Sequence, residues 1–266
     1  TPIGNLQEMT PRALEILNSV DVIACEDTRT SGQLLKHFDI HKRLIAYQNF
    51  NEESSCKGIV KLLSEGLNVA LISDAGYPLI NDPGQKVVTL ATQEGYNVVP
   101  VSGCSAFLNA LVASGLVAQP FLFIGFLPSS SSECKKKVQM YKDYPMTMVF
   151  YEAPHRIEKT LRILLEVFGN RRCTLARELT KLHEEFLRGT IEEILEVVNE
   201  LKGEMVIVVE GNTMDPQEAV TDEVLLQKVE EYIESGMKAS MAVKEVSKET
   251  GVSKNRIYEL VHRTKE

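Results

Sequence analysis

The stretch that decides the fold reads NVALISDAGYPLINDPG and covers residues 68–84. Its first part, Asn68–Ser73, is a short apolar run that predicts a buried strand. The rest is a loop with two Asp, two Gly and two Pro, residue types that fix turns and let the backbone approach a ligand. Helical spacing follows over residues 84–94. This succession is typical of an open α/β sheet, which binds ligands at the carboxyl ends of its strands.

The same alternation extends to both sides. Further apolar runs predict strands at Val20–Cys25, Arg43–Tyr47 and Asn97–Val101. Helical patterns lie between and after them, at residues 10–18, 31–38, 53–66 and 104–114. The first helix has clear start chemistry, with Thr10 as cap and Pro11 at the first helical position. Alternating strands and helices predict a mostly parallel sheet that is covered on both faces.

A second α/β unit follows a boundary that we expect near residue 117. Its predicted strands are Met146–Tyr151, Cys173–Ala176, Glu185–Arg188 and Glu204–Glu210, and its helices cover residues 155–168 and 190–201. Gly211–Thr221 reads as a linker. The sequence therefore predicts an N-terminal α/β domain over residues 1–117, a C-terminal α/β domain over 118–212 and a helical tail over 221–266.

The tail carries a helix-turn-helix pattern. Its predicted helices are Leu225–Ser235, Ala239–Thr250 and Ser253–His262, with Gly251 in the turn and Ser253 as cap. Residues 248–265 hold five basic and two acidic side chains, a local charge of +3 that leaves contact with nucleic acid as one interpretation. The alternative is a unit that only packs against protein surfaces.

Composition limits the class of protein. The net charge of −8 argues against a protein that coats bare nucleic acid through charge alone. No apolar run approaches the ~18 residues of a membrane span, and no secretory leader is recognisable. The five cysteines are scattered and form no CxxC pair, which predicts a reducing cytoplasm and neither a disulfide framework nor a metal site.

Polar residues in two of the loops have alternative roles. Asp74 is placed to bind a ribose hydroxyl or an amine, and Asp82 either joins it or caps the next helix. Val101–Ala106 is another junction between strand and helix, where backbone N–H groups favour an anionic group. It lacks the G-x-G-x-x-G pattern, so a dinucleotide site is not indicated, and a plain β–α turn is the alternative.

Charged residues follow other predicted strands. Glu26–Arg29 forms either a local ion pair or one side of a cleft, because three ionisable groups are costly to bury without partners. The passage 176–190 is either a solvated loop or a functional edge. His155, a residue type suited to proton transfer, follows Pro154 at a helix start, where a structural role is the alternative.

In this order, the segments resemble a known family. The motifs are Thr1-Pro2-Ile3-Gly4-Asn5-Leu6, Glu26-Asp27-Thr28-Arg29, Ser73-Asp74-Ala75-Gly76-x-Pro78, Asp82-Pro83-Gly84, Ala113-Ser114-Gly115-Leu116, Phe150-Tyr151-Glu152-x-Pro154-His155-Arg156 and Ala176-Arg177-Glu178-Leu179-Thr180-Lys181-x-His183-Glu184. They resemble the ribosomal RNA small subunit methyltransferase I family of the tetrapyrrole-methylase superfamily. The resemblance implies a two-domain class III methyltransferase fold with a helix-turn-helix-like C-terminal extension.

The resemblance also implies an activity. It is 2′-O-methylation of a decoding-centre cytidine of 16S ribosomal RNA in the small ribosomal subunit, by a cytoplasmic homodimer that uses S-adenosylmethionine and no metal. The cofactor contacts it implies are Pro2, Asp74, Tyr77, Ser105, Ala106, Tyr151, Ala176 and, as the weakest, Met205. Relatives usually have an apolar strand directly before Thr1, Thr in place of Tyr77 and Gly in place of Leu79.

Methyl transfer to a ribose hydroxyl needs a base and groups that hold phosphate. The base candidates are Glu26, Asp27, Glu178, Glu184 and a deprotonated Lys181, and the sequence does not choose among them. Arg29 and Arg177 are expected to hold phosphate through forked contacts, and Lys135, Lys136 and Lys137 add a basic RNA contact. Two other functions stay open: a methylase of small tetrapyrrole-type molecules, and a ligand-sensing regulator with a DNA-binding tail.

Overall fold

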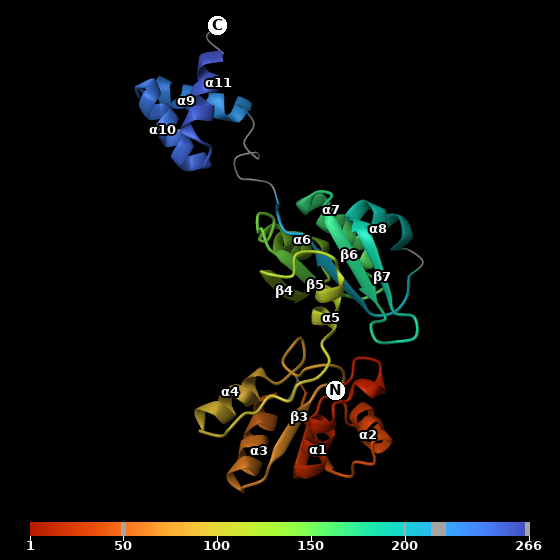
Figure 1. Cartoon of the computed structure of the whole chain (residues 1–266). Helices are drawn as coiled ribbons and strands as arrows, with labels where there is room; N and C mark the ends of the chain where they lie inside the picture. Colours follow the sequence, from red (N-terminus) through yellow and green to blue (C-terminus); the bar gives the residue numbers. More distant parts are fainter. Residues whose placement is uncertain (49–51, 199–200, 214–221, 264–266) are drawn as a thin grey trace. The chain divides into compact units, whose positions relative to one another are not determined.

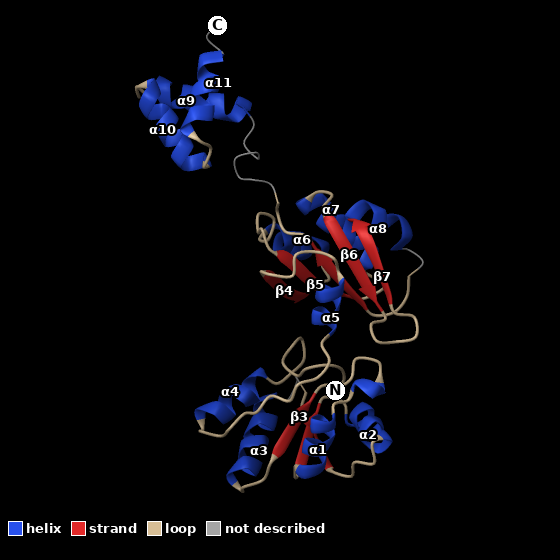
Figure 2. Ribbon diagram, in the orientation of Figure 1, coloured by secondary structure: helices blue, strands red, loops and turns tan. Residues whose placement is uncertain are grey.

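The computed structural model describes residues 1–48, 52–198, 201–213 and 222–263. The chain divides into two compact units, Thr1–Gly211 and Asn212–Glu266, and each is described here by itself (Figure 1). The first unit holds two sheets, one on each side of the expected boundary near residue 117 (Figure 2). A division of this unit into two domains at that point stays a prediction, and we call its two parts the N-lobe and the C-lobe.

The N-lobe is built on a parallel sheet in the order β2-β1-β3. Its strands are β1 (Val22–Cys25), β2 (Arg43–Ala46) and β3 (Val69–Ile72), and its helices are η1 (Leu6–Glu8), α1 (Pro11–Ser19), α2 (Thr28–His37), α3 (Glu52–Ser64) and α4 (Gln85–Gln93). Side chains alternate along the central strand: Ile23 packs with Leu17 and Leu35, whereas Ala24 packs with Ile59 and Val87. The predicted cover of helices on both faces is therefore confirmed.

The predicted strand Asn97–Val101 is wrong. This segment runs alongside β3 without forming a strand, and Val98 and Val99 are exposed. An apolar groove of about 550 Å³ is lined both by β3 and by residues 96–104, so the two backbones do not pair. β3 is thus an edge strand, and Thr1 lies at the groove. The expectation that an apolar strand fills this place stays a prediction.

The C-lobe holds a mixed five-stranded sheet in the order β4-β5-β8-β6-β7. Its strands are β4 (Phe121–Phe126), β5 (Thr147–Glu152), β6 (Arg172–Arg177), β7 (Glu185–Thr190) and β8 (Met205–Val209), and its helices are α6 (Ser131–Gln139), α7 (Ile157–Phe168) and α8 (Ile191–Val197). Of the strand pairings in the described C-lobe, β4–β5 is parallel and the other three are antiparallel. Thr190 and Glu193 form a reciprocal capping box, which explains the sharp change from β7 into α8.

A second hydrophobic cluster joins the two lobes. On one face of the C-lobe sheet, Ile207 packs with α7 and α8. On the other face, Val206 and Val208 pack with α5 (Ala106–Ala113) and with Ile3 of the opening loop. Because this hydrophobic core contains residues of both lobes, the N-lobe and the C-lobe pack against each other within the first unit.

The tail unit is three helices, as predicted: α9 (Asp222–Glu234), α10 (Ala239–Thr250) and α11 (Lys254–Arg263). Its own core includes Leu225, Val229, Val243 and Ile257. Gly251 ends α10 in the left-handed conformation with φ 72°, which explains why glycine stands in this turn. Most of the predicted linker, residues 214–221, lies outside the described residues. Among the described helices, none is long and apolar enough to cross a bilayer.

Candidate active site

The opening loop is tied to the loop after β3. The Thr1 amino group donates to the Gly76 carbonyl oxygen at 2.8 Å, and the Thr1 hydroxyl donates to the Ser73 carbonyl oxygen at 2.9 Å. The Gly76 N–H donates back to the Thr1 carbonyl oxygen at 3.1 Å. Gly76 has φ 75°, which few other residues adopt without strain. Pro2, a predicted cofactor contact, is buried within this joined surface, and Asp74 is exposed on it.

The turn before α5 lies next to these loops. The Gly103 N–H donates to the Tyr77 hydroxyl at 2.9 Å, so Tyr77 holds the small-residue turn. The Phe107 N–H, in the first turn of α5, donates to the Tyr151 hydroxyl at 3.3 Å. Burial raises the pKa of Tyr151, which therefore stays a neutral phenol. The structure thus connects the predicted contacts Tyr77, Ser105, Ala106 and Tyr151 through hydrogen bonds and the start of one helix.

Ala176 and Met205 come from the antiparallel strands β6 and β8. Ala176 is buried in the cluster that contains Ile3 and α5, which brings it to the other predicted contacts. Met205 belongs to the core on the opposite face of the sheet, and its neighbour Val206 faces α5. A cofactor contact of the Met205 side chain has no support in this packing, although the role of both positions stays a prediction.

Four carboxylates gather at the carboxyl ends of β1 and β3. Glu26 and Asp27 follow β1, and Asp74 and Asp82 belong to the loop after β3. The Asp27 N–H donates to Asp74 Oδ1 at 3.4 Å. Burial, with the charges of Asp74 and Asp27, raises the pKa of Glu26. Burial, with the charges of Glu26 and Asp74, raises the pKa of Asp82 to about 6.

Asp82 is the functional candidate that the sequence analysis undervalued. The alternative that it caps the next helix is wrong, because α4 begins after Gly84 with no side-chain cap. The adjacent Asn81 has φ 66° and lies against Gly125 of β4, where an added Cβ would come within 2.3 Å of Asn81 Oδ1. The loop is therefore seated tightly on the C-lobe. An Asp-Pro-Gly run after a buried strand was the available signal.

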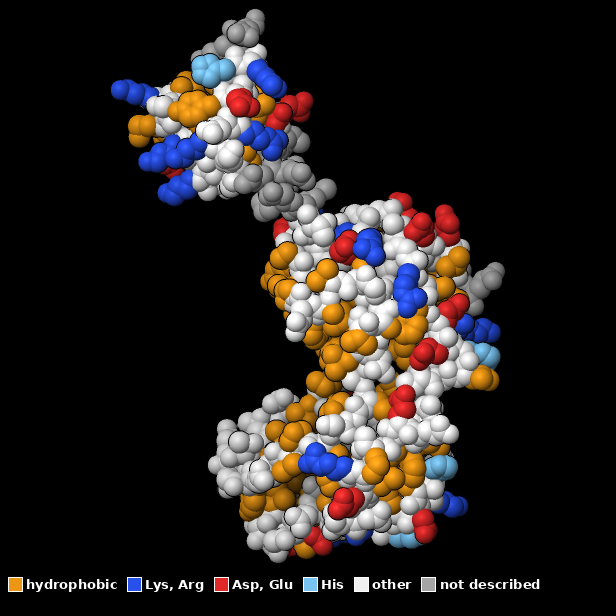
Figure 3. Space-filling view, in the orientation of Figure 1, with side chains coloured by type: hydrophobic (Ala, Val, Ile, Leu, Met, Phe, Trp, Pro, Cys, Tyr) orange, Lys and Arg blue, Asp and Glu red, His pale blue; other side chains and the backbone are white. Residues whose placement is uncertain are grey.

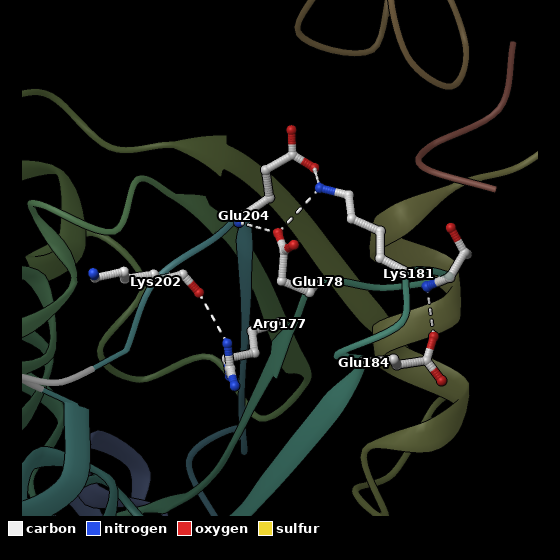
Figure 4. A network of polar contacts seen from close by, with 7 residues as sticks. Arg177, Glu178, Lys181, Glu184, Lys202 and Glu204 are labelled. Atoms are coloured by element: carbon white, nitrogen blue, oxygen red, sulfur yellow. Dashed lines mark hydrogen bonds and ion pairs between the residues drawn. The ribbon is translucent and has the colours of Figure 1, made fainter.

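The charged passage after β6 is an ordered network rather than a solvated loop (Figure 4). Lys181 Nζ donates to Glu178 Oε1 and Glu204 Oε2, each at 3.0 Å, and the Glu204 N–H donates to Glu178 Oε1 at 3.0 Å. The hydrogen bond from the Glu204 backbone and the one from Lys181 lower the pKa of Glu178. Burial opposes the charge of Lys181, but the hydrogen bonds to Glu204 and Glu178 outweigh it and raise its pKa.

Most of the predicted base candidates are therefore engaged. Glu184 accepts from the Thr180 N–H at 2.6 Å. Asp27 is the N-cap of α2 and pairs with Arg29 at 2.8 Å, which confirms the local ion pair. Hydrogen bonds from the Arg29 side chain and N–H lower the pKa of Asp27 to about 2. Among the residues that the structure describes, Glu26 is the one predicted base whose carboxylate has no hydrogen bond or ion pair.

The predicted phosphate contacts are not brought together. Arg177 Nε pairs with Glu185 at 2.6 Å and its Nη1 donates to the Lys202 carbonyl oxygen at 3.1 Å. Arg29 keeps 88% of its side chain exposed. Lys135–Lys137 lie on α6, which packs on α7, and Lys135 pairs with Glu166 at 2.5 Å. Of these positions, Arg29 is the one next to the carboxylates.

The residues present fit an S-adenosylmethionine site. Gly4 has φ 146°, and an added Cβ would meet Lys181 Cγ at 2.6 Å, so this glycine forms part of a narrow cradle. The buried Thr180 hydroxyl beside it has no hydrogen-bond partner among the described residues, which leaves a donor for a ligand. The four carboxylates suit a positively charged group. No group of His, Cys, Asp and Glu in the described part of the chain has the arrangement of a metal site.

Comparison with known proteins gives consistent matches. The family model of the Tetrapyrrole (Corrin/Porphyrin) Methylases matches residues 1–195. Proteins named ribosomal RNA small subunit methyltransferase I from Halalkalibacterium halodurans and Bacillus subtilis are each 43% identical, over 98% of this chain and 92% of their own length. Diphthine synthase is similar in fold, with a TM-score of 0.59 and 14% identity over 80% of this chain and 88% of that one. The uroporphyrin-III-C-methyltransferase of Thermus thermophilus has a TM-score of 0.55 and 19% identity, over 79% of this chain and 90% of that one.

Proposed function

The chain belongs to the tetrapyrrole (corrin/porphyrin) methylase family and is an S-adenosylmethionine-dependent methyltransferase, and from this premise we propose that its substrate is small-subunit ribosomal RNA. More closely, we propose transfer to the ribose 2′-hydroxyl of a decoding-centre cytidine. One observation carries the proposal: relatives named ribosomal RNA small subunit methyltransferase I are 43% identical over 98% of the chain. The match therefore continues past residue 195, where the family model ends, into the tail.

S-adenosylmethionine supplies an electrophilic methyl group on a positively charged sulfur. We propose that Pro2, Asp74, Tyr77, Ser105, Ala106, Tyr151 and Ala176 hold the cofactor. The hydrogen bonds among Thr1, Ser73 and Gly76, and that from Gly103 to Tyr77, hold the loops that carry Pro2, Asp74 and Tyr77. Alignment of the reacting groups can supply much of the rate of a displacement reaction, because it replaces the entropy cost of bringing two molecules together.

The ribose hydroxyl must lose its proton during attack. We propose that Asp82 accepts this proton, with Glu26 beside it. The ordinary rule is that a good base has a pKa near the working pH, and burial places the pKa of Asp82 at about 6. Of the five candidates first considered, Asp27, Glu178, Lys181 and Glu184 are held in ion pairs or hydrogen bonds.

Two finer features of the function are also proposals. We propose a homodimer, since Leu108, Val112 and Val117 at and just beyond α5 are exposed apolar side chains with exposed fractions of 42%, 73% and 65%. A cytoplasmic location is the natural place for an enzyme of ribosomal RNA. Analytical ultracentrifugation would test the homodimer, and fractionation of cells would test the location.

Asp74→Ala is expected to weaken binding of S-adenosylmethionine by about 10- to 100-fold, the value of a hydrogen bond to a charged group. Isothermal titration calorimetry measures it directly. Asp39→Ala removes the same charge from a side chain that is 94% exposed, and should bind as the wild type does. Equal affinity in both variants would remove Asp74 from the site.

Methyl incorporation into purified small ribosomal subunits then tests the substrate. Labelled 2′-O-methylcytidine in the decoding region is the expected product. Methylation of a tetrapyrrole and not of the subunit would favour the small-molecule methylase. Binding of duplex DNA with a steep salt dependence, and no binding of S-adenosylmethionine, would favour the regulator.

A further inference from the structure

We infer that the tail unit, residues 222–263, binds the phosphate backbone of the RNA substrate through the exposed surfaces of α10 and α11. The inference rests on the proposed function, because it names the surface that recognises that substrate. The tail lies beyond the residues that the family model matches, so the methylase fold itself does not account for it.

The core of the tail uses one side of α10 and α11. Ala242, Val243, Val246, Val252 and Ile257 are at most 1% exposed and pack with α9. The side chains that project from the other sides of α10 and α11 contribute nothing to this core. Their charge and spacing are therefore free to serve binding.

Charge is divided unevenly over the three helices. α9 carries five acidic residues and one lysine, Lys228. Residues 238–263 carry six Lys and Arg residues and three Glu. These six are Lys238, Lys244, Lys248, Lys254, Arg256 and Arg263. Figure 3 shows several Lys and Arg side chains on the face of the tail that is turned to the viewer.

The ion pairs leave the excess of positive charge on α10 and α11 unchanged, because they neutralise one acid and one base of these two helices. Glu249 of α10 is neutralised from α9, by Lys228 at 2.9 Å and by the hydroxyl of Tyr232. Arg256 pairs with Asp222 of α9 at 2.9 Å. Lys244, Lys248 and Lys254 are exposed and have no ion pair among the residues that the structure describes. Three unpaired ammonium groups thus face water. A nucleic acid phosphate that binds such a group releases counterions, and this release favours binding.

The spacing places these groups in stripes. Lys244 and Lys248 are four residues apart on α10, and Lys254, Tyr258 and His262 repeat at four residues on α11, so each set shares one side of its helix. Tyr258, partly buried and one turn from Lys254, offers a ring on which a base can stack. The second helix of a helix-turn-helix is the one that enters a nucleic acid groove in proteins of this shape.

A protein partner fits this surface less well. Protein interfaces have an apolar centre with few lysines. The large apolar side chains exposed in the described tail are Val224, Ile233 and Met241, and two of these lie on α9. α10 and α11 together offer only Met241. The surface therefore suits a polyanion, and the substrate of the proposed reaction is one.

The test compares two triple variants of the full chain. Lys244→Gln/Lys248→Gln/Lys254→Gln removes three charges from the tail. Lys36→Gln/Lys57→Gln/Lys61→Gln removes three exposed lysines from α2 and α3 of the N-lobe, so both proteins have the same net charge. Circular dichroism and calorimetry with S-adenosylmethionine check that both fold and bind the cofactor.

The tail variant is expected to raise the KM for small ribosomal subunits about 10-fold or more, with kcat unchanged. In direct binding to small-subunit RNA, the slope of log affinity against log salt should fall by ~2 for three lost phosphate contacts. The N-lobe variant should match the wild type in both measurements. A tail that only packs against protein surfaces would not be expected to produce these shifts in KM and salt slope.

Equal KM and equal salt slope in the two variants would overturn the inference. A raised KM on assembled subunits with unchanged binding of naked RNA would also overturn it and indicate a ribosomal protein. Tighter binding of duplex DNA than of RNA would do the same. If the wild type methylates no small-subunit RNA, the proposed function fails, and the salt slope still decides whether the tail binds RNA.

Discussion

Asp82→Asn is expected to lower the rate of methyl transfer by ~10²–10⁴-fold, the usual contribution of a positioned base, with binding of S-adenosylmethionine retained. Asparagine keeps the size of the side chain and loses only its ability to take a proton. The loop should stay in place, because Asn81 and Gly125 seat it. Single-turnover methylation of small subunits at saturating cofactor measures the effect.

The pH dependence of the wild-type enzyme should report the same group. Because the pKa of Asp82 is raised to about 6, the carboxyl is protonated below that pH and cannot accept a proton. The rate is therefore expected to rise through pH 6 and to level off above 7. The residual activity of Asp82→Asn should lack this rise.

Protonation of Asp82 should also affect stability: the free energy of unfolding is expected to fall as the pH rises, whereas the rate increases. The folded pKa of Asp82 lies above its ordinary value of 3.8, so the folded state holds the proton more tightly. That stabilisation is complete below about pH 4 and is lost as the pH rises through 6. The asparagine never ionises, so the variant should unfold at a higher temperature than the wild type at pH 7.5 and at a similar one at pH 4.

Glu94→Gln is the matched control, since Glu94 is exposed at the end of α4. It should change neither the rate nor the unfolding temperature. A wild-type rate in Asp82→Asn at pH 7.5 would remove Asp82 as the base. Glu26→Gln would then be the next variant to measure, because the pKa of Glu26 is also raised and its charge acts on Asp82.

Glu152→Ala is expected to destabilise the first unit by about 3–5 kcal/mol, the cost of breaking a buried ion pair. The Glu152 side chain is 0% exposed and lies 3.2 Å from Arg156 Nε. It also accepts from the Thr160 hydroxyl at 2.5 Å and from the Ala153 N–H at 2.8 Å. Alanine would leave a guanidinium and a hydroxyl without this partner at the end of β5.

Thermal unfolding followed by calorimetry should show the loss as a drop of roughly 6–20 °C, at 2–4 °C per kcal/mol for a unit of this size. Glu158→Ala is the control, because it breaks a pair of the same i,i+4 spacing with Arg162, in which the carboxylate is 42% exposed. Its cost should be about 0.3–0.5 kcal/mol. Equal midpoints in the two variants would show that burial of the Glu152 pair has no energetic weight.

The parts of the fold that could be predicted are those set by local pattern. The apolar run before Asp74, the cap at Thr10 and the turn at Gly251 each determine structure within a few residues, and all three are present, with β3 partly buried. Asn97–Val101 has the same apolar pattern as a strand, yet a strand also needs a neighbour to pair with. The groove separates residues 97–101 from β3, so this segment has no strand to pair with. Such a separation cannot be predicted from the local sequence pattern.

The candidate site shows the same limit. Strand ends and small-residue turns indicated where Asp74, Tyr77 and Ala106 would lie. Which carboxylates are free depends on near and distant partners together: Lys181 holds Glu178, three residues away, and Glu204, 23 residues away, holds Lys181. Asp82 becomes a base candidate because folding buries it and also brings Glu26 and Asp74 near it. A hydrogen bond between residues 23 positions apart, such as that from Lys181 to Glu204, could not be predicted from the sequence pattern.

The central place of β1 in the N-lobe sheet also sets how slowly its backbone exchanges hydrogen with water. β1 is paired along its whole length on both sides, by β2 and by β3. Its amides can therefore exchange only when the sheet itself opens, and not through small local openings at a loop or a terminus. We expect the amides of Val22–Cys25 to be among the last in the N-lobe to take up deuterium.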